Sequence, residues 1–489
     1  MEQMERPPSA LLYVGGFLRR HGFGVAVHHI AQRQMPETAR AIATDPDLLW
    51  VGLSAMTGTQ VTRSAELSRA VKALRPGATV VWGGVHPSLM PAECLAFGYV
   101  DYVVIGEGER TALDLSAHLA AGGRRKPADI PGLAYLDGDG RLHRTPDRPL
   151  ERNLDDFRQD WSLVDARRYL VPYADGRGVY FISSRGCPHD CAFCYNLAFN
   201  HRRWRTHSVD FVVDELAALK AAHGIKYVVF DDDNFFANRS RALELLRRLK
   251  ALEITVTWLE LRIDYITAEL MAELSGLGVG SVFFGWESGS DRTLSRISKG
   301  FGRDIIVEKM ALLGSYPQLL VDASAIVGFP WETEADVSAT VATALEMFRR
   351  KPFGVNFNLG LYVPYPGTPL VPEALASGFR FPTDPEGWER FDILSGEMRV
   401  PWLTLEQIRR YHLLDRFAKV LYVPGKAPLP LRLPAYAAAL LAYARLHQGV
   451  LGLAVEPWLR ARAERFWLER RQRRLAQRSS TDGSRVSPT

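Results

Sequence analysis

The chain has 489 residues and a formal net charge of +5, with 47% hydrophobic and 24% charged residues, which are ordinary values for a globular protein. This length predicts about two or three domains, and the small net charge makes a nucleic-acid partner unlikely. Four cysteines are too few for a secreted disulfide framework, and the polar segment 1–9 does not resemble a secretion signal. We therefore expect a cytoplasmic protein.

Residues 1–125 predict a doubly wound, Rossmann-like α/β domain. Helices are expected at Leu11–His21 and about Gln60–Leu74, and strands at Gly24–His29, Leu48–Ser54 and Thr79–Trp82. Ligands of such sheets bind beyond the carboxyl ends of the strands.

Three short motifs lie at or just after such strand ends. They are Ser54-Ala-Met-Thr-Gly-Thr-Gln60, Trp82-Gly-Gly-Val-His-Pro-Ser88 and Val104-Ile-Gly-Glu-Gly-Glu109. Gly83 and Gly84 lack side chains, so the backbone there would let a large flat ligand approach closely. Residues 126–172 then predict a linker, in which Leu136–Arg141 carries a hairpin turn signal.

The cysteines Cys187, Cys191 and Cys194 form a C-x3-C-x2-C pattern within the segment 184–196. Three thiolates can hold three irons of a [4Fe–4S] cube. Ordinary electron-transfer clusters take four cysteine ligands, so the fourth iron would stay open to a small molecule. The spacing therefore favours a catalytic cluster.

A structural zinc site is the main alternative for these cysteines. It would need His189 or His201 as the fourth ligand, because no second C-x2-C pattern exists. The remaining cysteine, Cys94, lies in an apolar helical stretch and is interpreted as a packing residue.

Residues 173–385 predict six strand–helix units, which form a partial (β/α)6 barrel of the TIM type with right-handed crossovers. Active sites of such barrels lie at the carboxyl ends of the strands. The strands are expected at Val179–Ser183, Lys226–Asp231, Thr255–Ile263, Gly280–Gly285, Leu320–Val327 and Gly354–Val363.

Polar or glycine-rich segments follow the second to sixth of these strands. They occupy residues 230–235, 260–262, 285–290, 326–330 and 364–369. Glycine and proline mark most turns, so each segment alone is weak. Together with the cysteine spacing, however, their order resembles the radical S-adenosylmethionine (SAM) superfamily, in which SAM chelates the open iron.

This resemblance implies a SAM site at the strand ends. An aspartate there would hold the amino group of SAM, with a solvated helix cap as the alternative. A G-x-E-S-G-S segment would lie near the ribose and carboxylate, and the backbone of 326–330 near adenine. The residues so implicated are Phe193, Asp232, Asp233, Arg262, Glu287, Ser288 and Gly328.

The N-terminal motifs, placed before such a core, resemble the cobalamin-binding domain of B12-dependent radical SAM proteins. That group contains many methyltransferases and the anaerobic protoporphyrin ester cyclase, and the resemblance covers about residues 1–385. It implies cobalamin contacts from Ser54, Met56, Thr57, Gly58, Gln60, Gly83, Gly84, His86, Glu107 and Gly108.

Two features depart from that family. The motif D-x-H-x-x-G, whose histidine is the lower cobalt ligand, is absent. His86 could approach the corrin, but capping of a turn is favoured. Only six residues precede Pro7, so the obvious first strand of the sheet is lacking. Either the start codon is misassigned or the domain binds cobalamin weakly.

Residues 386–489 predict a mostly helical region with a basic tail. The stretch Leu431–Val455 is too interrupted by charge for a membrane span. Leu459–Arg478 predicts a basic amphipathic helix, for which packing on the barrel is favoured over a membrane surface or RNA. Disorder is predicted for Ser479–Thr489.

The resemblance implies three cofactors, namely a [4Fe–4S] cluster, SAM and cobalamin. The expected function is reductive cleavage of SAM to a 5′-deoxyadenosyl radical, hydrogen abstraction and methyl transfer to a small or lipid-like molecule. A flavodoxin- or ferredoxin-type protein would supply electrons. The alternatives are an oxidative cyclase, a non-catalytic regulator and, less favoured because only Cys94 lies outside the triad, a tRNA methylthiotransferase.

Overall fold

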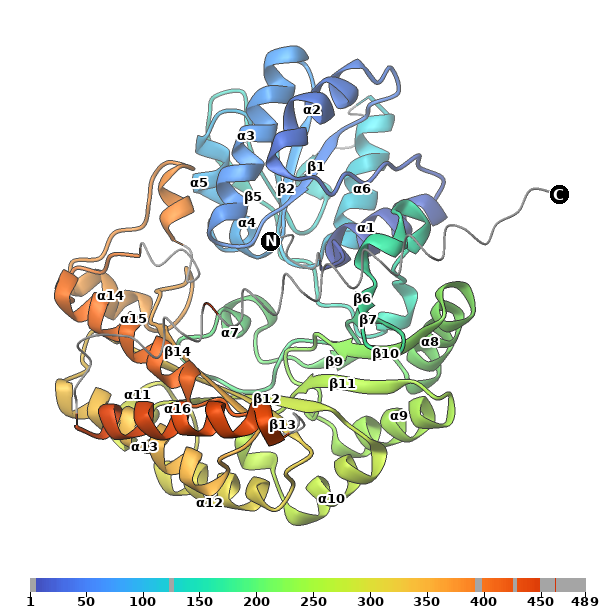
Figure 1. The fold of residues 1–489 in the computed structure, drawn as a ribbon. Coiled ribbons are helices and arrows are strands. Elements are labelled where there is room, and N and C mark those ends of the chain that lie inside the picture. The colour runs from blue at the N-terminus through green and yellow to red at the C-terminus, as the bar shows by residue number, and fades with distance from the viewer. Residues whose placement is uncertain (1–5, 123–126, 392–397, 425–428, 449–461, 463–489) are drawn as a thin grey trace. The chain divides into compact units, whose positions relative to one another are not determined.

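The computed structural model describes residues 6–122, 127–391, 398–424 and 429–448 together with Arg462 (Figure 1). The chain forms two compact units. The first contains the chain up to Phe283 together with Leu294–Phe301 and Tyr362–Leu403. The second contains Phe284–Thr293, Gly302–Leu361 and the residues from Thr404 onward.

The N-terminal part of the first unit contains a five-stranded sheet in the order β1-β2-β3-β4-β5. Strands β1 to β3 are parallel, and β4 and β5 follow as an antiparallel hairpin on the edge of the same sheet. The predicted hairpin turn is thereby confirmed. The strands are β1 (Val51–Ser54), β2 (Val80–Gly83), β3 (Tyr102–Val104), β4 (Leu133–Leu136) and β5 (Leu142–Arg144).

Helices pack on this sheet in two groups (Figure 1). Helices α2 and α3 contact each other, and a core that includes Ala39, Val51 and Val71 joins them to β1. Helices α1 and α6 form the other pair. The helices are α1 (Ser9–Arg20), α2 (Met35–Thr44), α3 (Thr59–Leu74), α4 (Val85–Leu89), α5 (Pro91–Ala96) and α6 (Gly108–Ala120).

The strand predicted at Gly24–His29 is wrong, because these residues belong to no strand. A β-carbon placed on Gly15 of α1 would lie 3.2 Å from Val25 and 3.6 Å from Val27. The alternating valines thus pack against a helix instead of one face of a sheet. An extended segment becomes a strand only when a neighbouring strand satisfies its backbone groups, and no described strand pairs with this one.

The second large sheet is the curled half-barrel, in the order β14-β13-β12-β11-β10-β7-β6. Its six main strands follow the prediction closely, and the neighbours β7/β10, β10/β11, β11/β12 and β13/β14 are parallel. They are β7 (Arg177–Phe181), β10 (Ile225–Phe230), β11 (Thr255–Glu260), β12 (Ser281–Glu287), β13 (Leu320–Val327) and β14 (Val355–Leu361), with β6 (Val171–Pro172) at the edge. The predicted fold class is therefore confirmed.

Helices follow the barrel strands in sequence, with boundaries set by local caps. The hydroxyl of Ser208 accepts a hydrogen bond from the Phe211 N–H at 3.1 Å to begin α8, which ends at Gly224 with a φ of 63°. The helices are α8 (Val209–His223), α9 (Arg239–Ala251), α10 (Ala268–Leu277), α11 (Asp291–Arg296), α12 (Arg303–Gly314), α13 (Glu334–Arg350) and α14 (Val371–Ala376).

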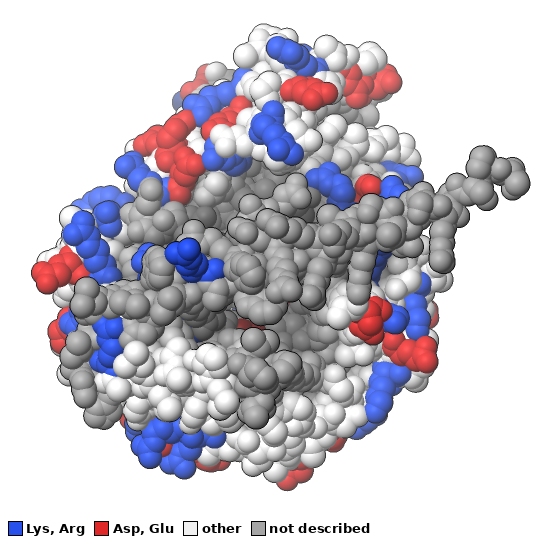
Figure 2. All heavy atoms as spheres, in the orientation of Figure 1, with Lys and Arg blue, Asp and Glu red and all other residues white. Residues whose placement is uncertain are grey.

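The C-terminal region contains α15 (Leu405–Val420) and α16 (Leu429–Gln448). Among the described residues, no helix is long and apolar enough to span a bilayer. The predicted basic helix Leu459–Arg478 lies outside the described residues except for Arg462, and Ser479–Thr489 lies wholly outside them. On the face drawn in Figure 2, described basic and acidic side chains are interspersed, as the small net charge implies.

Candidate active site

The three motif cysteines lie on one loop beyond the carboxyl end of β7. The loop runs from β8 (Ser184–Arg185) to β9 (Arg205–Thr206), contains α7 (Tyr195–Asn200), and is closed by antiparallel pairing of β8 with β9. All three thiols are free and partly buried. The Cys194 N–H donates to the Cys191 carbonyl at 3.1 Å, which folds the loop back on itself.

The surroundings of these thiols suit a cationic metal cluster. Asn234 Nδ2 lies 3.6 Å from Cys187 Sγ, and Arg262 Nη1 lies 3.8 Å from Cys191 Sγ. Burial raises the pKa of Cys194 to about 12 and also raises that of Cys187. A bound metal would supply positive charge that favours the thiolate form of these side chains.

Among the described residues, no group of three or more His, Cys, Asp or Glu side chains forms a site for a single metal ion. A cube differs from such a site, because it spreads three thiolates over three iron corners. The assignment of Cys187, Cys191 and Cys194 to a cluster stays a prediction.

A second segment of the first unit, residues 294–301, contacts the cysteine loop. The Ala192 N–H donates to the Ile297 carbonyl at 2.9 Å, and Arg262 Nη2 donates to the Lys299 carbonyl at 2.7 Å. The buried Lys299 ammonium lies 6.0 Å from the ring centroid of Phe193. Lys299 was missed from the sequence, where it belongs to no distinctive motif, and Asn234 was given no role although it lies in the segment 230–235.

The aspartates predicted to hold SAM support the start of the loop. Buried Asp232 accepts hydrogen bonds at 2.6 Å from the Ser183 N–H and from the hydroxyls of Ser183 and Ser184. Asp233 accepts from the Gly186 N–H at 2.8 Å. The contacts of Asp232 favour a structural role. One carboxylate oxygen of Asp233 is hydrogen-bonded to the backbone of the loop.

Glu260 lies at the carboxyl end of β11, close to this aspartate cluster. Burial, reinforced by the charge of Asp233, raises the pKa of Glu260 to about 8. At neutral pH the side chain is therefore mostly a neutral acid that can donate a hydrogen bond. The sequence marked the segment 260–262 but assigned no role to Glu260, because its burial depends on distant residues.

In the second unit, the end of β12 carries Glu287 and Ser288. Glu287 has a φ of 62°, and its carboxylate folds back over Gly285, where a β-carbon would lie 1.9 Å from Oε1. The Ser288 hydroxyl lies 3.1 Å from that of Thr340. The G-x-E pattern thus has a steric cause, because only glycine leaves room for this carboxylate.

Gly328 follows β13 in the same unit and has a φ of 85°. Its N–H donates to Glu332 Oε2 at 2.7 Å, and the Phe329 N–H donates to the same oxygen at 3.2 Å. Burial raises the pKa of Glu332 to about 7. Glu332 was missed from the sequence, although its spacing four residues after Gly328 could have suggested this turn.

In the first unit, the loop after β2 lies close to the loop after β1, and both carry residues predicted to contact cobalamin. A β-carbon on Gly84, whose φ is 98°, would lie 2.9 Å from the Ala55 carbonyl oxygen and 3.1 Å from the Ser54 hydroxyl. In the first of these loops, the Met56 N–H donates to Gln60 Oε1 at 2.9 Å. Gly58, with a φ of 114°, precedes α3, and Gly83 ends β2.

His86 is fully buried beneath these loops. Its Nδ1 lies 3.3 Å from the Thr57 hydroxyl, and its ring packs edge-on against Trp388. The backbone N–H of His86 donates to the Ala55 carbonyl at 3.1 Å. Burial lowers the pKa of His86 to about 4, so the imidazole is neutral. The role of the His86 side chain stays a prediction.

Glu107 and Gly108 contact other parts of the first unit. Glu107 forms ion pairs with Arg185 and Arg205, which flank the cysteine loop. Burial opposes ionisation, but the two guanidinium groups outweigh it and lower the pKa of Glu107. A β-carbon on Gly108 would lie 3.3 Å from Val14 of α1. Neither residue was assigned these contacts from the sequence.

Two family models match separate parts of the chain. The B12 binding domain model matches residues 3–116, and the Radical SAM superfamily model matches residues 181–344. An uncharacterized methyltransferase of Pyrococcus horikoshii is 30% identical over 416 residues, which are 83% of this chain and 85% of that protein. The chain belongs to the radical SAM proteins with a B12-binding domain.

Two further relatives agree with this placement. The anaerobic magnesium-protoporphyrin IX monomethyl ester cyclase of Cereibacter sphaeroides is 26% identical over 75% of this chain and 60% of its own length. The methyltransferase TsrM from Kitasatospora setae, solved with cobalamin and a [4Fe–4S] cluster bound, has a TM-score of 0.62 at 22% identity and covers 77% of this chain and 74% of its own. That likeness shows the shared fold.

The predicted family is confirmed, and with it the expectation of a radical SAM enzyme with three cofactors, namely the [4Fe–4S] cluster, SAM and cobalamin. The residue assignments within the sites stay predictions.

Proposed function

We propose that this protein is a cobalamin-dependent radical SAM methyltransferase that methylates an unactivated carbon of a small or lipid-like molecule. The observation that carries the proposal is the direct ion pairing of Glu107, in the B12-binding domain, with the arginines that flank the cysteine loop. Two cofactor sites joined by buried contacts suit a reaction that uses both. The Pyrococcus relative, itself named a methyltransferase, supports the same class.

The cysteine loop has a defined role in this proposal. Cys187, Cys191 and Cys194 hold the cluster, while Asn234 and Arg262 direct donors toward two of their sulfurs. Such donors stabilise electron density on the sulfurs and help set the reduction potential. When bound, the cluster supplies one electron to SAM, and cobalamin supplies a methyl carrier.

The residues that we propose to orient SAM are those the family resemblance implies. Glu287 and Ser288 lie at the end of β12, Gly328 follows β13, Asp233 follows β10, and Phe193 lies in the cysteine loop. Glu260 holds a proton on its carboxyl group at neutral pH, which adds a hydrogen-bond donor at the strand ends. The reaction requires a site from which water is excluded, because water would otherwise quench a reactive carbon radical.

We assign the cobalamin pocket to the loops after β1 and β2. Gly83 and Gly84 allow close backbone approach, and the side chains of Ser54, Thr57 and Gln60 supply polar contacts. His86 is assigned to the pocket wall, because Thr57 and Trp388 already enclose its ring.

Labelled SAM tests methyl transfer. Anaerobically reconstituted protein, a low-potential reductant, SAM with a ¹³C-methyl group and a small-molecule extract of the producing cells are incubated together. We expect ¹³C-labelled product, S-adenosylhomocysteine and 5′-deoxyadenosine, measured by mass spectrometry. The 26% identity to the cyclase favours oxidative cyclisation as the second candidate. It predicts 5′-deoxyadenosine with no label in the product.

The electron donor and location are further parts of the proposal. We propose a flavodoxin- or ferredoxin-type donor in the cytoplasm, because the cluster needs a one-electron reductant. Replacement of dithionite by reduced flavodoxin should sustain 5′-deoxyadenosine formation. Failure of both flavodoxin and ferredoxin to do so, while dithionite works, contradicts this choice.

The membrane contact expected for the basic helix Leu459–Arg478 falls outside the described residues except for Arg462. We propose a separate contact with a membrane surface through α16. Its residues Leu433, Leu440 and Leu441 are 59%, 46% and 53% exposed, and their spacing places them on one helix face. Sedimentation with anionic vesicles tests the contact. We expect the wild type to sediment and a variant with Leu433→Ser, Leu440→Ser and Leu441→Ser to stay in solution. Equal behaviour of the two proteins contradicts the proposal.

A further inference from the structure

The ribbon that closes the cysteine loop places two positive charges opposite each other. In the antiparallel pair β8–β9, Ser184 faces Thr206 and Arg185 faces Arg205. The residues between these strands, 186–204, include all three cysteines. Like charges directly opposite each other in a strand pair are destabilising. The base of the loop therefore needs an anion between the two arginines.

Glu107 of the B12-binding domain supplies that anion. Its Oε1 accepts hydrogen bonds from Arg205 Nη1 at 2.6 Å and from Arg185 Nη1 at 3.0 Å, and Arg185 Nη2 donates to Glu109 at 2.7 Å. The other oxygen of Glu107 accepts from the Glu151 N–H at 3.0 Å, which fixes the carboxylate. The Glu107 side chain is 11% exposed and that of Arg205 8%, so solvent and salt screen the pair weakly.

Aromatic rings complete the enclosure of Arg185. Its guanidinium carbon lies 4.7 Å from the ring centroid of Tyr13 in α1 and 5.7 Å from that of Phe157. Contacts of this kind add cation–π attraction in a desolvated site. Arg185 is thus held by the B12-binding domain through both charge and packing, two residues before the first cysteine.

The same anion is linked to the glycine loop that is assigned to cobalamin. The Ser88 hydroxyl donates to the Gly84 carbonyl at 2.7 Å and accepts from the Gly106 N–H at 2.9 Å. Gly106 directly precedes Glu107. A ligand that orders the loop at Gly84 thereby also orders the backbone that presents Glu107 to the ribbon.

We propose that Glu107 is a positioning residue that fastens the cysteine loop to the B12-binding domain and makes retention of the cluster depend on bound cobalamin. The inference rests on the two-cofactor function proposed above. The loop must open to lose iron, and opening separates Arg185 and Arg205 from Glu107. Cobalamin that stabilises the closed arrangement must slow this opening, and by linkage an intact cluster must tighten cobalamin binding.

Iron release tests the coupling without measuring turnover. Full-length protein is reconstituted anaerobically, and loss of iron to bathophenanthroline is followed by absorbance with and without hydroxocobalamin. We expect cobalamin to slow release by about fivefold or more in the wild type, the lower end of ordinary coupling between sites. In Glu107→Gln, which keeps the shape but removes the charge, the effect should fall below about twofold. The dissociation constant of cobalamin should also stop depending on the cluster.

Asp114→Asn is the matched control. Asp114 lies on α6, the helix that begins next to Glu107, and pairs with Arg148, outside the cysteine loop. This variant should keep the wild-type protection. If Glu107→Gln does not fold, as judged by circular dichroism, Glu109→Gln provides the same comparison, because it removes one of the two carboxylates that hold Arg185.

The outcomes separate the two proposals. Equal protection by cobalamin in the wild type and in Glu107→Gln, with iron and corrinoid bound in both, overturns the inference and leaves the proposed function intact. If cobalamin gives no protection in the wild type, the inference is likewise overturned and the proposed function stays intact. A wild type that binds no corrinoid at all overturns both.

Discussion

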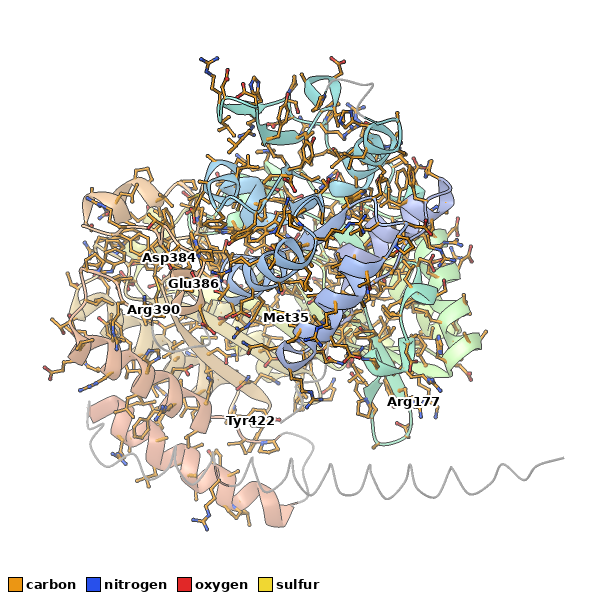
Figure 3. The ribbon with its side chains drawn as sticks, turned by 90° about the horizontal axis from the view of Figure 1, so that it is seen from above. Met35, Arg177, Asp384, Glu386, Arg390 and Tyr422 are labelled. Atoms are coloured by element: carbon orange, nitrogen blue, oxygen red, sulfur yellow. The ribbon has the colours of Figure 1, made fainter. Side chains whose placement is uncertain are left out.

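The indole ring of Trp388 lies edge-on against the imidazole of His86, with ring centroids 4.5 Å apart and ring planes at 72°. The indole N–H donates to Glu93 Oε1 at 2.6 Å, although the two residues are 295 positions apart in the chain. The surrounding segment also pairs with α3, through Arg63 with Glu389 and Arg69 with Glu386. Figure 3 labels Glu386 on this segment, between α14 and α15.

Replacement of Trp388 should destabilise the first unit. The ring is fully buried, so Trp388→Ala should lower the free energy of unfolding by about 3–5 kcal/mol. Thermal unfolding followed by circular dichroism measures this loss. The control Glu386→Gln breaks an exposed ion pair and should cost less than about 1 kcal/mol. A Trp388→Ala variant as stable as that control contradicts the assignment.

The acid Glu260 should make stability depend on pH. Its pKa is raised by burial from 4.5 to about 8, so the folded state binds more protons than the unfolded state between these values. The free energy of unfolding must therefore fall as pH rises through this window, by at most on the order of 5 kcal/mol. Glu260→Gln cannot ionise, so it should gain stability over the wild type from pH 5 to pH 8. Urea unfolding at both pH values tests this, and a constant difference contradicts it.

Variants of the three motif cysteines should differ in iron content from a variant of the fourth cysteine, Cys94. Alanine at Cys187, Cys191 or Cys194 removes one of three cluster ligands and should abolish both bound iron and 5′-deoxyadenosine formation. Cys94→Ala changes a fully buried side chain, so it should keep iron and lose only about 1 kcal/mol of stability. Iron analysis after reconstitution distinguishes these results. Normal iron in any motif variant contradicts the assignment.

A methyl group at Gly285 should weaken SAM binding while leaving the fold intact. The new β-carbon would lie 1.9 Å from Glu287 Oε1, the mobile end of a side chain, so Gly285→Ala should displace that carboxylate. We expect SAM affinity to fall about tenfold or more, equivalent to about 1.4 kcal/mol, measured by equilibrium dialysis.

Gly276→Ala is the control for that prediction. Gly276 lies in α10, and a β-carbon there meets nothing within 4 Å. This change should leave SAM affinity unaltered and stabilise the helix by about 0.5–1 kcal/mol. Unchanged SAM affinity in Gly285→Ala would remove Glu287 from the site.

The sequence predicted those features of the fold and site that depend only on residues close together in the chain. The spacing of Cys187, Cys191 and Cys194 fixes one loop, and runs of apolar residues fix the barrel strands, because side-chain periodicity belongs to each strand separately. Gly24–His29 shows the limit. Valines do alternate with other residues there, but a strand also requires a neighbouring strand to pair with. A short stretch of sequence does not show whether such a neighbour exists.

Assignments that depend on distant partners could not be made in this way. Glu107 was placed with cobalamin because of its motif, whereas its charge partners Arg185 and Arg205 lie 78 and 98 residues later. For Asp232, predicted to contact SAM, the hydrogen-bond partners Ser183 and Ser184 lie nearly 50 positions earlier. Lys299 gave no signal at all, since its closeness to Phe193 arises only from folding.

The contact between Trp388 and His86 also orders events during translation. At about 5–20 residues per second, the ribosome needs roughly 15–60 s after His86 to deliver Trp388. Throughout that interval His86 lacks the indole ring that packs against it in the folded protein. The packing around His86 is therefore completed only after most of the chain has been synthesised.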